Sequence, residues 1–464
     1  MNIPLARALR LSSPSCVAFT GAGGKTTAMF RLARQLQPPV IVAATTHLGA
    51  WQVEFADQHV IADSPAALEN VEHGLKGVVL ATGALDGDRT RPISESVLDR
   101  LHQFCGYHSI PLLIEADGSR QKPLKAWSEH EPPIPEFADA VAQVTGLSGL
   151  GKPLTDEYVH RAELFSELCG LEIGETVTTE ALARVLTHPR GGLKNVPARA
   201  RRIALLNQAD SAERQAAALA MTSSLLRVHH SVIIASLMNG IVHAVHESIA
   251  GIVLAAGASS RFGEPKQLLD WKGQPFVRAV TQTALTAGLS PVVVVTGANA
   301  EGVEAAVNDL EVIVARNEEW QSGQGSSIRA GVLALAPVAT SGFDTPDERG
   351  LLDPLLRAGP VVGGAIFLLA DQPQVTPSII QALMEKHAEG LHPIVAPMAM
   401  DRRANPVLFD RAAFPDLLTI EGDVGGRAIF HKHRVEYLPW HDDRLLLDVD
   451  TPEQYRRLAS DGDV

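Results

Sequence analysis

The chain has few cysteines and few aromatic residues. Its 464 residues include only three cysteines, Cys16, Cys105 and Cys169, and these form no C-x-x-C pair, which argues against a disulfide framework and a cysteine zinc site. Aromatic residues supply 5% of the chain, so Ala, Val and Leu must fill most of the core. This composition is typical of α/β proteins with buried parallel strands and disfavours an all-β sandwich.

Long apolar runs and an excess of basic residues are also missing. No stretch reaches about 18 uninterrupted apolar residues, and residues 1–10 lack the apolar segment of a secretion signal. The 40 basic and 53 acidic side chains give a net charge of −13, which opposes binding to nucleic acid or to anionic lipid. We therefore expect a cytoplasmic protein with neither a nucleic-acid nor a membrane partner.

Two segments open in the same way, with a short apolar strand, a glycine-rich turn and a helical pattern. They comprise residues 16–20, 21–27 and 28–35 in the first half, and 251–255, 257–263 and 276–287 in the second. This order is how α/β nucleotide-binding domains begin. At about 150 residues per domain the length suits two large domains, and we expect them to span residues 1–247 and 248–464.

Further strands are expected between helical patterns in both halves. They lie at residues 40–44, 77–81, 111–115, 140–145, 202–206 and 232–236, and then at 291–296, 311–315, 365–370, 393–396, 435–439 and 445–449. The fold class is therefore α/β, with two domains that each contain a mostly parallel sheet flanked by helices. Residues 336–364 have little periodicity and are expected to form a surface insertion.

The second glycine loop reads L-A-A-G-A-S-S-R-F-G-E-P-K. Its glycines let the backbone approach a triphosphate, while Arg261 and Lys266 supply cationic donors for phosphate oxygens. A solvated loop with two exposed cations is the alternative. We expect nucleotide contacts from Leu254, Ala255, Ala256, Gly257, Ser259 and Gly263.

Two aspartates follow expected strands of the second half. Asp371 comes after residues 365–370 and Asp450 after residues 445–449, which places both at the carboxyl edge of the sheet. Two such carboxylates can hold Mg²⁺, although each could instead cap the helix that follows it. We expect both to act in catalysis together with Arg261 and Lys266.

The glycine loop and four later motifs resemble the MobA-like nucleotidyltransferase family. These motifs are L-L-A-D-Q-P at 368–373, N-P-V-L-F at 405–409, E-G-D-V-G-G-R at 421–427 and L-D-V-D-T-P-E at 447–453. The resemblance implies a Rossmann-like nucleotidyltransferase domain, most similar to molybdenum cofactor cytidylyltransferase. It implies transfer of CMP from CTP to molybdopterin-bound molybdenum, with release of pyrophosphate. GTP as donor, or a sugar phosphate as acceptor, is the alternative within this class.

The same resemblance assigns further residues to the two substrates. It places Ser327 near the base and ribose, and Asn405, Pro406, Asp423 and Arg427 beside the acceptor. Asp423 could instead be an ordinary turn residue, and Ser326 and Ser327 could be helix N-caps.

The first glycine loop, T-G-A-G-G-K-T-T, resembles the short T-G-x-x-G-K-T phosphate loop of Mur-type ligases. Backbone amides, the Lys25 ammonium and the Thr26 hydroxyl could hold phosphates and a Mg²⁺ ion. We expect ATP or GTP to be bound there by Gly21, Gly24, Lys25, Thr26 and Thr27. Glu115 and Asp117 follow a strand and are candidates for the metal; as an alternative they are turn carboxylates.

Later motifs of the first half extend its resemblance. L-N-Q-A-D at 206–210 resembles the guanine-reading N-K-x-D motif, except that Gln208 replaces lysine, which leaves the base open. With A-T-T-H-L, E-A-D-G-S-R and G-K-P-L-T-D-E-Y-V-H-R, these segments resemble the YqeC family, described as an accessory of selenium-dependent hydroxylases. The fusion implies work on molybdenum hydroxylase maturation, with a hydroxylase apoenzyme as partner. A nucleotide-gated chaperone that delivers the cofactor without transferring a nucleotide is the alternative of another class.

Overall fold

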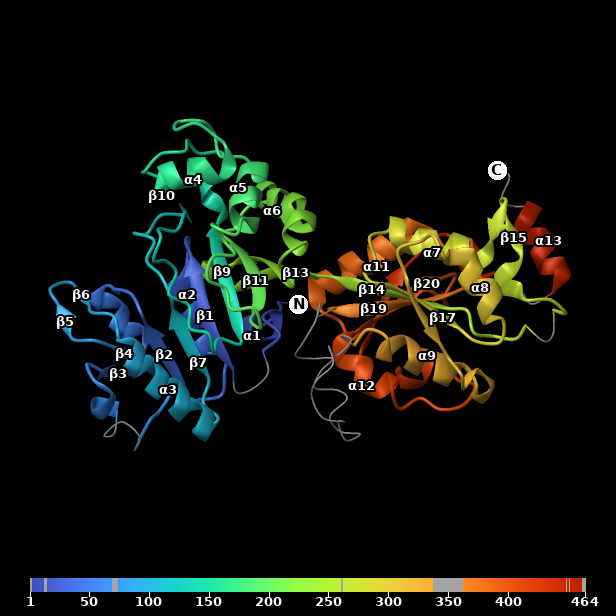
Figure 1. Cartoon of the computed structure of the whole chain (residues 1–464), viewed down its shortest axis with the longest axis horizontal. Coiled ribbons are helices and arrows are strands. Elements are labelled where there is room, and N and C mark those ends of the chain that lie inside the picture. The colour runs from blue at the N-terminus through green and yellow to red at the C-terminus, as the bar shows by residue number, and fades with distance from the viewer. Residues whose placement is uncertain are drawn as a thin grey trace. The chain divides into compact units, whose positions relative to one another are not determined.

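The computed structural model of the chain describes residues 2–11, 15–68, 74–259, 262–336, 362–447, 449 and 451–460. The chain divides into two compact units, Met1–His246 and Glu247–Val464. Both units are α/β structures, as Figure 1 shows, so the expected fold class is confirmed.

The first unit is built on a nine-stranded sheet with the order β13-β12-β11-β9-β1-β7-β2-β4-β3. These strands are β1 (Cys16–Gly21), β2 (Val40–Ala44), β3 (Gln58–Ile61), β4 (Val78–Thr82), β7 (Leu112–Glu115), β9 (Ala140–Gly146), β11 (Arg201–Asn207), β12 (Ser231–Ser236) and β13 (Ile241–Glu247). β1 lies between β7 and β9 and pairs parallel with both, and parallel pairing continues outward to β3 and to β12. The carboxyl ends of these strands therefore meet at one edge of the sheet.

Helices and short ribbons complete the first unit. The helices are α1 (Leu5–Ala8), α2 (Lys25–Ala33), α3 (Glu95–His108), α4 (Ala162–Cys169), α5 (Thr179–Thr187) and α6 (Ala212–Leu226). The ribbons pair β5 (Leu85–Asp86) with β6 (Arg89–Thr90), and β8 (Leu124–Lys125) with β10 (Val159–His160). α3 packs its apolar stripe on the central strands in one core, while α4, α5 and α6 share another with β11 and β12.

The second unit contains a mixed eight-stranded sheet with the order β18-β17-β14-β19-β22-β20-β21, with β23 paired to β20. Its strands are β14 (Ile249–Leu254), β17 (Val292–Thr296), β18 (Ile313–Arg316), β19 (Gly364–Leu369), β20 (Ile394–Ala399), β21 (Arg402–Arg403), β22 (Val407–Asp410) and β23 (Val435–Pro439). β14 pairs parallel with β17 and β19, whereas β22 runs antiparallel to β19 and β20. A short hairpin of β15 (Asp270–Trp271) and β16 (Gln274–Pro275) precedes the first long helix.

Alternating residues of β14 divide the second unit into two cores. Ile249 and Val253 pack with α7 (Phe276–Thr286), α8 (Ala300–Val307) and α11 (Pro377–Gly390). Ala250 and Ile252 pack with α9 (Gln324–Leu333) and α12 (Phe414–Leu417) on the opposite face, as seen in Figure 1. The last helix is α13 (Pro452–Ser460). In the described ranges no helix combines the length and the apolar character that a bilayer crossing requires.

The prediction of a strand at residues 445–449 is wrong. A 3₁₀ turn spans Asp443–Leu446, because the Asp442 carboxylate accepts a hydrogen bond from the backbone N–H of Arg444 at 3.0 Å and pairs with its guanidinium. Leu445 is buried by this turn rather than by strand pairing. Three earlier expectations lie outside the described residues: Arg261, Asp450, and residues 337–361 of the proposed insertion.

A buried histidine makes the first unit sensitive to acid. His229 lies against the Leu225 carbonyl at 3.1 Å and the side-chain amide of Gln143 at 3.0 Å, and burial lowers its pKa to about 4. Between that value and about 6.5 the unfolded chain binds the extra proton, so acidification favours unfolding. We expect the unfolding free energy to fall by about 1.4 kcal/mol per pH unit from this residue over that window.

Urea unfolding of the full chain at pH 7, 6 and 5 measures this slope. His229→Gln should make the slope shallower by this contribution, whereas the same change at the exposed His108 should leave the slope unchanged. Equal slopes in the two variants would contradict the assignment.

Candidate functional site

The first glycine loop connects β1 to α2 in backbone conformations that require glycine. Gly21, Gly23 and Gly24 have φ angles of +99°, +77° and +125°, a region that side-chain-bearing residues rarely adopt. A Cβ atom on Gly24 would also collide with the side-chain amide of Asn207. The loop therefore brings its backbone against the ends of other strands, and α2 begins directly at Lys25.

Lys25 and Thr26 face two carboxylates from the strand beside β1. The buried Lys25 Nζ donates to the Gly21 carbonyl at 2.6 Å and lies 3.3 Å from Asp117 Oδ1. The Thr26 hydroxyl donates to Glu115 Oε2 at 3.0 Å. The structure thus brings together Lys25, Thr26, Glu115 and Asp117, four of the polar residues that the sequence singled out in this half.

Asp117 is held by several hydrogen bonds within the protein, and its expected role as a metal ligand stays a prediction. Its Oδ2 accepts hydrogen bonds from the Thr20 hydroxyl at 2.8 Å, Lys125 Nζ at 2.8 Å and the Trp127 indole at 2.7 Å. Burial opposes ionisation of Asp117, but the ammonium groups of Lys25 and Lys125 outweigh it and lower its pKa. With its oxygens engaged in this way, the carboxylate holds the loop in place.

Sequence reasoning missed Lys125 and Trp127. Lys125 is also 3.1 Å from Glu131, which forms a two-point pair with Arg161. The available signal was a lysine inside the otherwise apolar run P-L-K-A-W, because a buried lysine needs a carboxylate partner.

Glu115 remains the better candidate for a cation in this half. Burial raises its pKa, although the nearby Lys25 ammonium partly offsets that effect. Gln52 Nε2 donates to the same Thr26 hydroxyl at 3.1 Å. A hydroxyl and a carboxylate beside a phosphate loop form the oxygen set that Mg²⁺ prefers.

The second glycine loop leaves β14 at Leu254 and is cross-linked by a residue that the sequence did not reveal. Buried Gln267 donates to the Gly257 carbonyl at 2.9 Å and accepts from the Ser259 hydroxyl at 3.1 Å. Ser259 Oγ accepts in turn from the Lys266 backbone N–H at 3.0 Å. Nothing in the spacing of E-P-K-Q-L marked Gln267 as a brace.

Space remains open beside two glycines of this loop. A Cβ atom added to Gly257 or Gly263 would have no described heavy atom within 4 Å. Ala255 and Ala256, by contrast, are buried and continue the backbone from β14 into the loop. Packing within the described residues thus leaves room for a ligand to approach the loop at these two glycines.

Asp371 lies at the same sheet edge as this loop. Leu369, the last residue of β19, pairs with Leu254, and the backbone N–H of Ala370 donates to the Leu254 carbonyl at 3.1 Å. The chain therefore reaches Asp371 immediately beside the start of the loop. Asp371 was predicted at this edge because it directly follows a strand.

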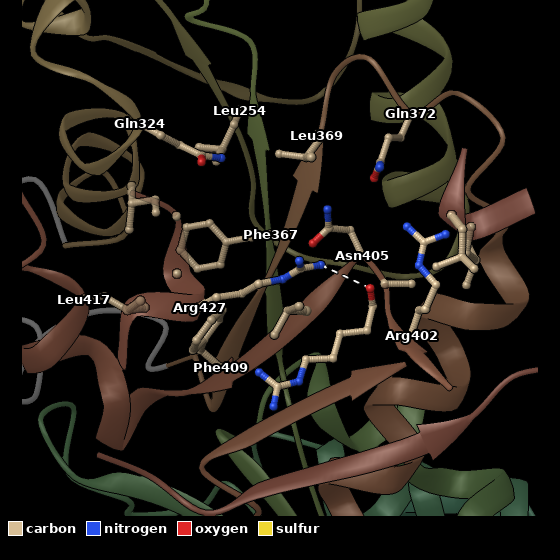
Figure 2. A pocket seen from close by; sticks show the side chains of 18 residues that line it. Leu254, Gln324, Phe367, Leu369, Gln372, Arg402, Asn405, Phe409, Leu417 and Arg427 are labelled. Carbon is tan, nitrogen blue, oxygen red and sulfur yellow. Dashed lines mark hydrogen bonds between the residues drawn. The ribbon is translucent and has the colours of Figure 1, made fainter. Parts of the chain in front are cut away.

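A pocket of about 320 Å³ opens beside Leu254. Figure 2 shows Phe367 and Gln324 on one side of it, Arg402 on the other, and Arg427 crossing toward Asn405, which lies in the bend between β21 and β22. The complete lining is Leu254, Gln324, Ile328, Phe367, Leu369, Gln372, Arg402, Arg403, Ala404, Asn405, Val407, Phe409, Leu417, Gly425, Gly426, Arg427, Leu445 and Leu446. Of the four expected acceptor residues, Asn405 and Arg427 line this pocket, whereas Pro406 and Asp423 do not.

Two arginines of this pocket, Arg403 and Arg427, are held by protein contacts. Arg427 donates to the Arg403 carbonyl at 3.3 Å, the contact drawn as a dashed line in Figure 2. The Arg403 guanidinium stacks over Phe430 and Tyr437 at 5.7 and 5.4 Å. Sequence reasoning missed Arg402 and Arg403, although the pair R-R directly before A-N-P was a visible signal of positive charge.

Ser327 does not line this pocket, and its environment is internal. It lies within α9 and is buried, and Asn317 Nδ2 donates to the hydroxyls of Ser326 and Ser327 at 2.8 and 3.0 Å. The residue that caps α9 is Gly323, so the alternative reading of the serines as N-caps is wrong. Asp423 accepts from the backbone N–H of Gln324 at 3.4 Å and thereby supports the start of this helix.

Comparison with known proteins assigns each half to a family. The family model "YqeC protein" matches residues 17–163, and the model "MobA-like NTP transferase domain" matches residues 251–437. The chain is 33% identical over 207 residues to the Escherichia coli (strain K12) "Uncharacterized protein YqeC", covering 43% of this chain and 78% of the relative.

Two relatives match the second half. The "Nicotine blue oxidoreductase" of Paenarthrobacter nicotinovorans is 31% identical over 219 residues, covering 45% of this chain and 96% of the relative. The "Probable molybdenum cofactor guanylyltransferase" of Bacillus cytotoxicus is 37% identical over 79 residues, covering 17% of this chain and 38% of the relative. The chain belongs to the YqeC family through its first half and to the MobA-like NTP transferase family through its second.

Proposed function

We propose that residues 248–464 transfer CMP from CTP to the molybdenum cofactor and release pyrophosphate. The observation that carries this proposal is the meeting of the open glycine loop, Asp371 and the arginine-lined pocket at one sheet edge. Similarity to a protein named as a molybdenum cofactor guanylyltransferase supports the acceptor class. The choice of CTP rests on the sequence resemblance described above.

The proposed step is a direct in-line displacement. An oxygen of the acceptor's terminal phosphate attacks the α-phosphorus of the nucleotide, and the bond from that phosphorus to the oxygen bridging to the β-phosphorus breaks. Pyrophosphate leaves with the bonding electrons, so no covalent enzyme intermediate is needed. Lys266, Arg261 and the loop amides stabilise the charge that develops on the leaving group.

The carboxylates of this half suit Mg²⁺, which would neutralise charge on the α-phosphate when bound. Mg²⁺ binds through one or two carboxylates and completes its shell with water and substrate phosphates. Asp371 meets this requirement at the loop, and we assign Asp450 the same role from its motif. Within the described residues no group of three or more His, Cys, Asp or Glu side chains could form a cage made only of protein.

The pocket beside Leu254 is our proposed acceptor site. Arg427 and Arg402 supply positive charge for an anionic acceptor, and the Phe367 and Phe409 side chains supply an apolar wall for a flat ring system. We expect Arg427→Ala to raise the KM for the cofactor by about 10- to 100-fold, since a charged hydrogen bond contributes about 1.5–3 kcal/mol. The KM for the nucleotide should change little, because Arg427 does not lie on the glycine loop.

Steady-state kinetics with each substrate varied in turn measure these two KM values. Arg434→Ala removes a charge just before β23, at a residue that does not line the pocket, and it should leave both KM values unchanged. If Arg427→Ala raised the KM for the nucleotide as much as the KM for the cofactor, Arg427 would not belong to the acceptor site.

For residues 1–247 we propose nucleotide binding at the phosphate loop. Gly21, Gly24, Lys25, Thr26 and Thr27 would hold the phosphates of ATP or GTP, with Glu115 beside the cation. The collected polar groups around Lys25 and Thr26 support this assignment. We propose that residues 1–247 use this nucleotide in delivering the finished cofactor to a molybdenum hydroxylase apoenzyme.

The direct test supplies the purified full chain with molybdenum cofactor, Mg²⁺ and each of the four nucleoside triphosphates in turn, and measures pyrophosphate. We expect the largest yield with CTP. A larger yield with GTP would overturn the choice of base. Cofactor delivery without any pyrophosphate would favour the chaperone alternative.

A further inference from the structure

We infer that the first half reads a guanine base at the carboxyl ends of β9, β11 and β12. This inference rests on the proposed nucleotide binding by the phosphate loop and adds the identity of the base. It is carried by the contacts of Asn207, Gln208 and Asp210, the segment whose function the sequence left open.

The two sides of the phosphate loop differ in chemistry. Thr26 points to Glu115 on β7, so the cation and the terminal phosphates belong on that side of β1. On the other side β1 is followed by β9, β11 and β12. With its terminal phosphates on the β7 side, a nucleotide that lies along this sheet edge has its base over the ends of β9, β11 and β12.

Two residues of α2, Thr27 and Arg31, contact the short turn Leu237–Asn239 that follows β12. The Thr27 hydroxyl lies 3.9 Å from the sulfur of Met238, and Arg31 donates to the Met238 carbonyl at 2.6 Å. Met238 itself is 73% exposed. The chain after β12 thus forms a wall next to the phosphate loop, with an apolar side chain open to a ligand.

Asn207 joins the three loops that would surround the base. Its amide nitrogen donates to the Gly23 carbonyl of the phosphate loop at 2.8 Å, and its amide oxygen accepts from the Leu237 backbone N–H at 2.9 Å. The second hydrogen on the same nitrogen is a donor for N7 of a purine. Because Asn207 is only 2% exposed, these contacts fix the edge before any ligand arrives.

Gln208 explains the departure from the lysine of the guanine-reading motif. Its side-chain oxygen accepts from the Ser148 hydroxyl at 2.5 Å, which ties the chain after β11 to the chain after β9. This contact makes Gln208 a brace between two loops. The base-reading function then falls to Asn207 and Asp210.

Asp210 supplies the discrimination between guanine and adenine. Its carboxylate is 44% exposed and lies 3.7 Å from Arg214 in the first turn of α6. Two carboxylate oxygens can accept from N1–H and the 2-amino group of guanine, whereas adenine presents an acceptor at N1. A carboxylate at this point therefore favours guanine and repels adenine.

Calorimetric titration of the full chain with GDP, ADP and XDP in the presence of Mg²⁺ tests the inference. Lys25→Ala identifies the signal that belongs to the phosphate loop. We expect that signal to show GDP binding at least about 10-fold tighter than ADP, the effect of one hydrogen bond to a charged group.

Asp210→Asn should shift the preference of the site from GDP toward XDP. An asparagine amide can accept from N1–H and donate to the 2-oxo group of xanthine, so XDP should gain affinity while GDP loses at least about 10-fold. Glu213→Gln removes a neighbouring exposed carboxylate and should leave the GDP preference intact.

The outcomes separate this inference from the proposal beneath it. Equal Lys25-dependent affinity for GDP and ADP, or unchanged GDP binding in Asp210→Asn, would overturn the inference while leaving nucleotide binding in place. The absence of any Lys25-dependent binding would overturn the proposed nucleotide site as well.

Discussion

Replacing Asp371 with asparagine is expected to lower pyrophosphate release by at least about 100- to 1000-fold, the effect of removing one electrostatic contact to a transition state. The substitution keeps the size of the side chain and removes the charge that would hold Mg²⁺ beside the α-phosphate. Backbone pairing between Leu369 and Leu254 does not depend on this side chain, so the fold should persist.

Single-turnover measurement of pyrophosphate with saturating CTP and cofactor isolates this effect from binding. Glu385→Gln, an exposed carboxylate on α11, is the matched control and should retain full activity. Asp371→Asn with activity close to that of the unsubstituted protein would exclude Asp371 from the metal site.

Asp117→Ala is expected to destabilise the first half by about 3–5 kcal/mol, the usual effect of breaking a buried ion pair from one side. The change leaves the Lys25 and Lys125 ammonium groups buried without their shared carboxylate. Burial already lowers the pKa of Lys125, and Asp117 opposes that shift, so its loss should drive Lys125 further toward the neutral form.

Urea unfolding followed in the full chain measures this loss, and pyrophosphate release by the second half reports whether that unit remains folded. Asp156→Ala is the control, because Asp156 pairs with Lys122 at 3.9 Å with its side chain 81% exposed. That pair should contribute less than about 1 kcal/mol. A similar loss in the two variants would contradict the anchoring role of Asp117.

The sequence predicted the strands that form short apolar runs and the residues that directly follow them. Short apolar runs indicate strands, so the buried β2 and the half-buried β23 were predicted with their observed bounds. Asp371 could be placed at the sheet edge because parallel strands end together. The glycines of the first loop are explained by φ angles and close approaches that exclude other residues.

The remaining features depend on side-chain contacts that the pattern of apolar residues does not show. Residues 445–449 have the apolar composition of a strand, but the cap by Asp442 turns the chain first. Asp117 gains its anchoring contacts from Lys125 and from the indole of Trp127, which its position after a strand does not predict. Gln267 and Arg403 likewise gain their roles from carbonyls and rings that the local sequence does not contain.

Transfer of the α-phosphorus from donor to acceptor is the central claim and can be measured directly. CTP labelled at the α-phosphorus is incubated with the full chain, Mg²⁺ and molybdenum cofactor, and the products are separated. We predict label in the cofactor in an amount equal to the pyrophosphate released, with both lost in Asp371→Asn. Label that remains in CTP, or that appears only as free CMP, would contradict the account.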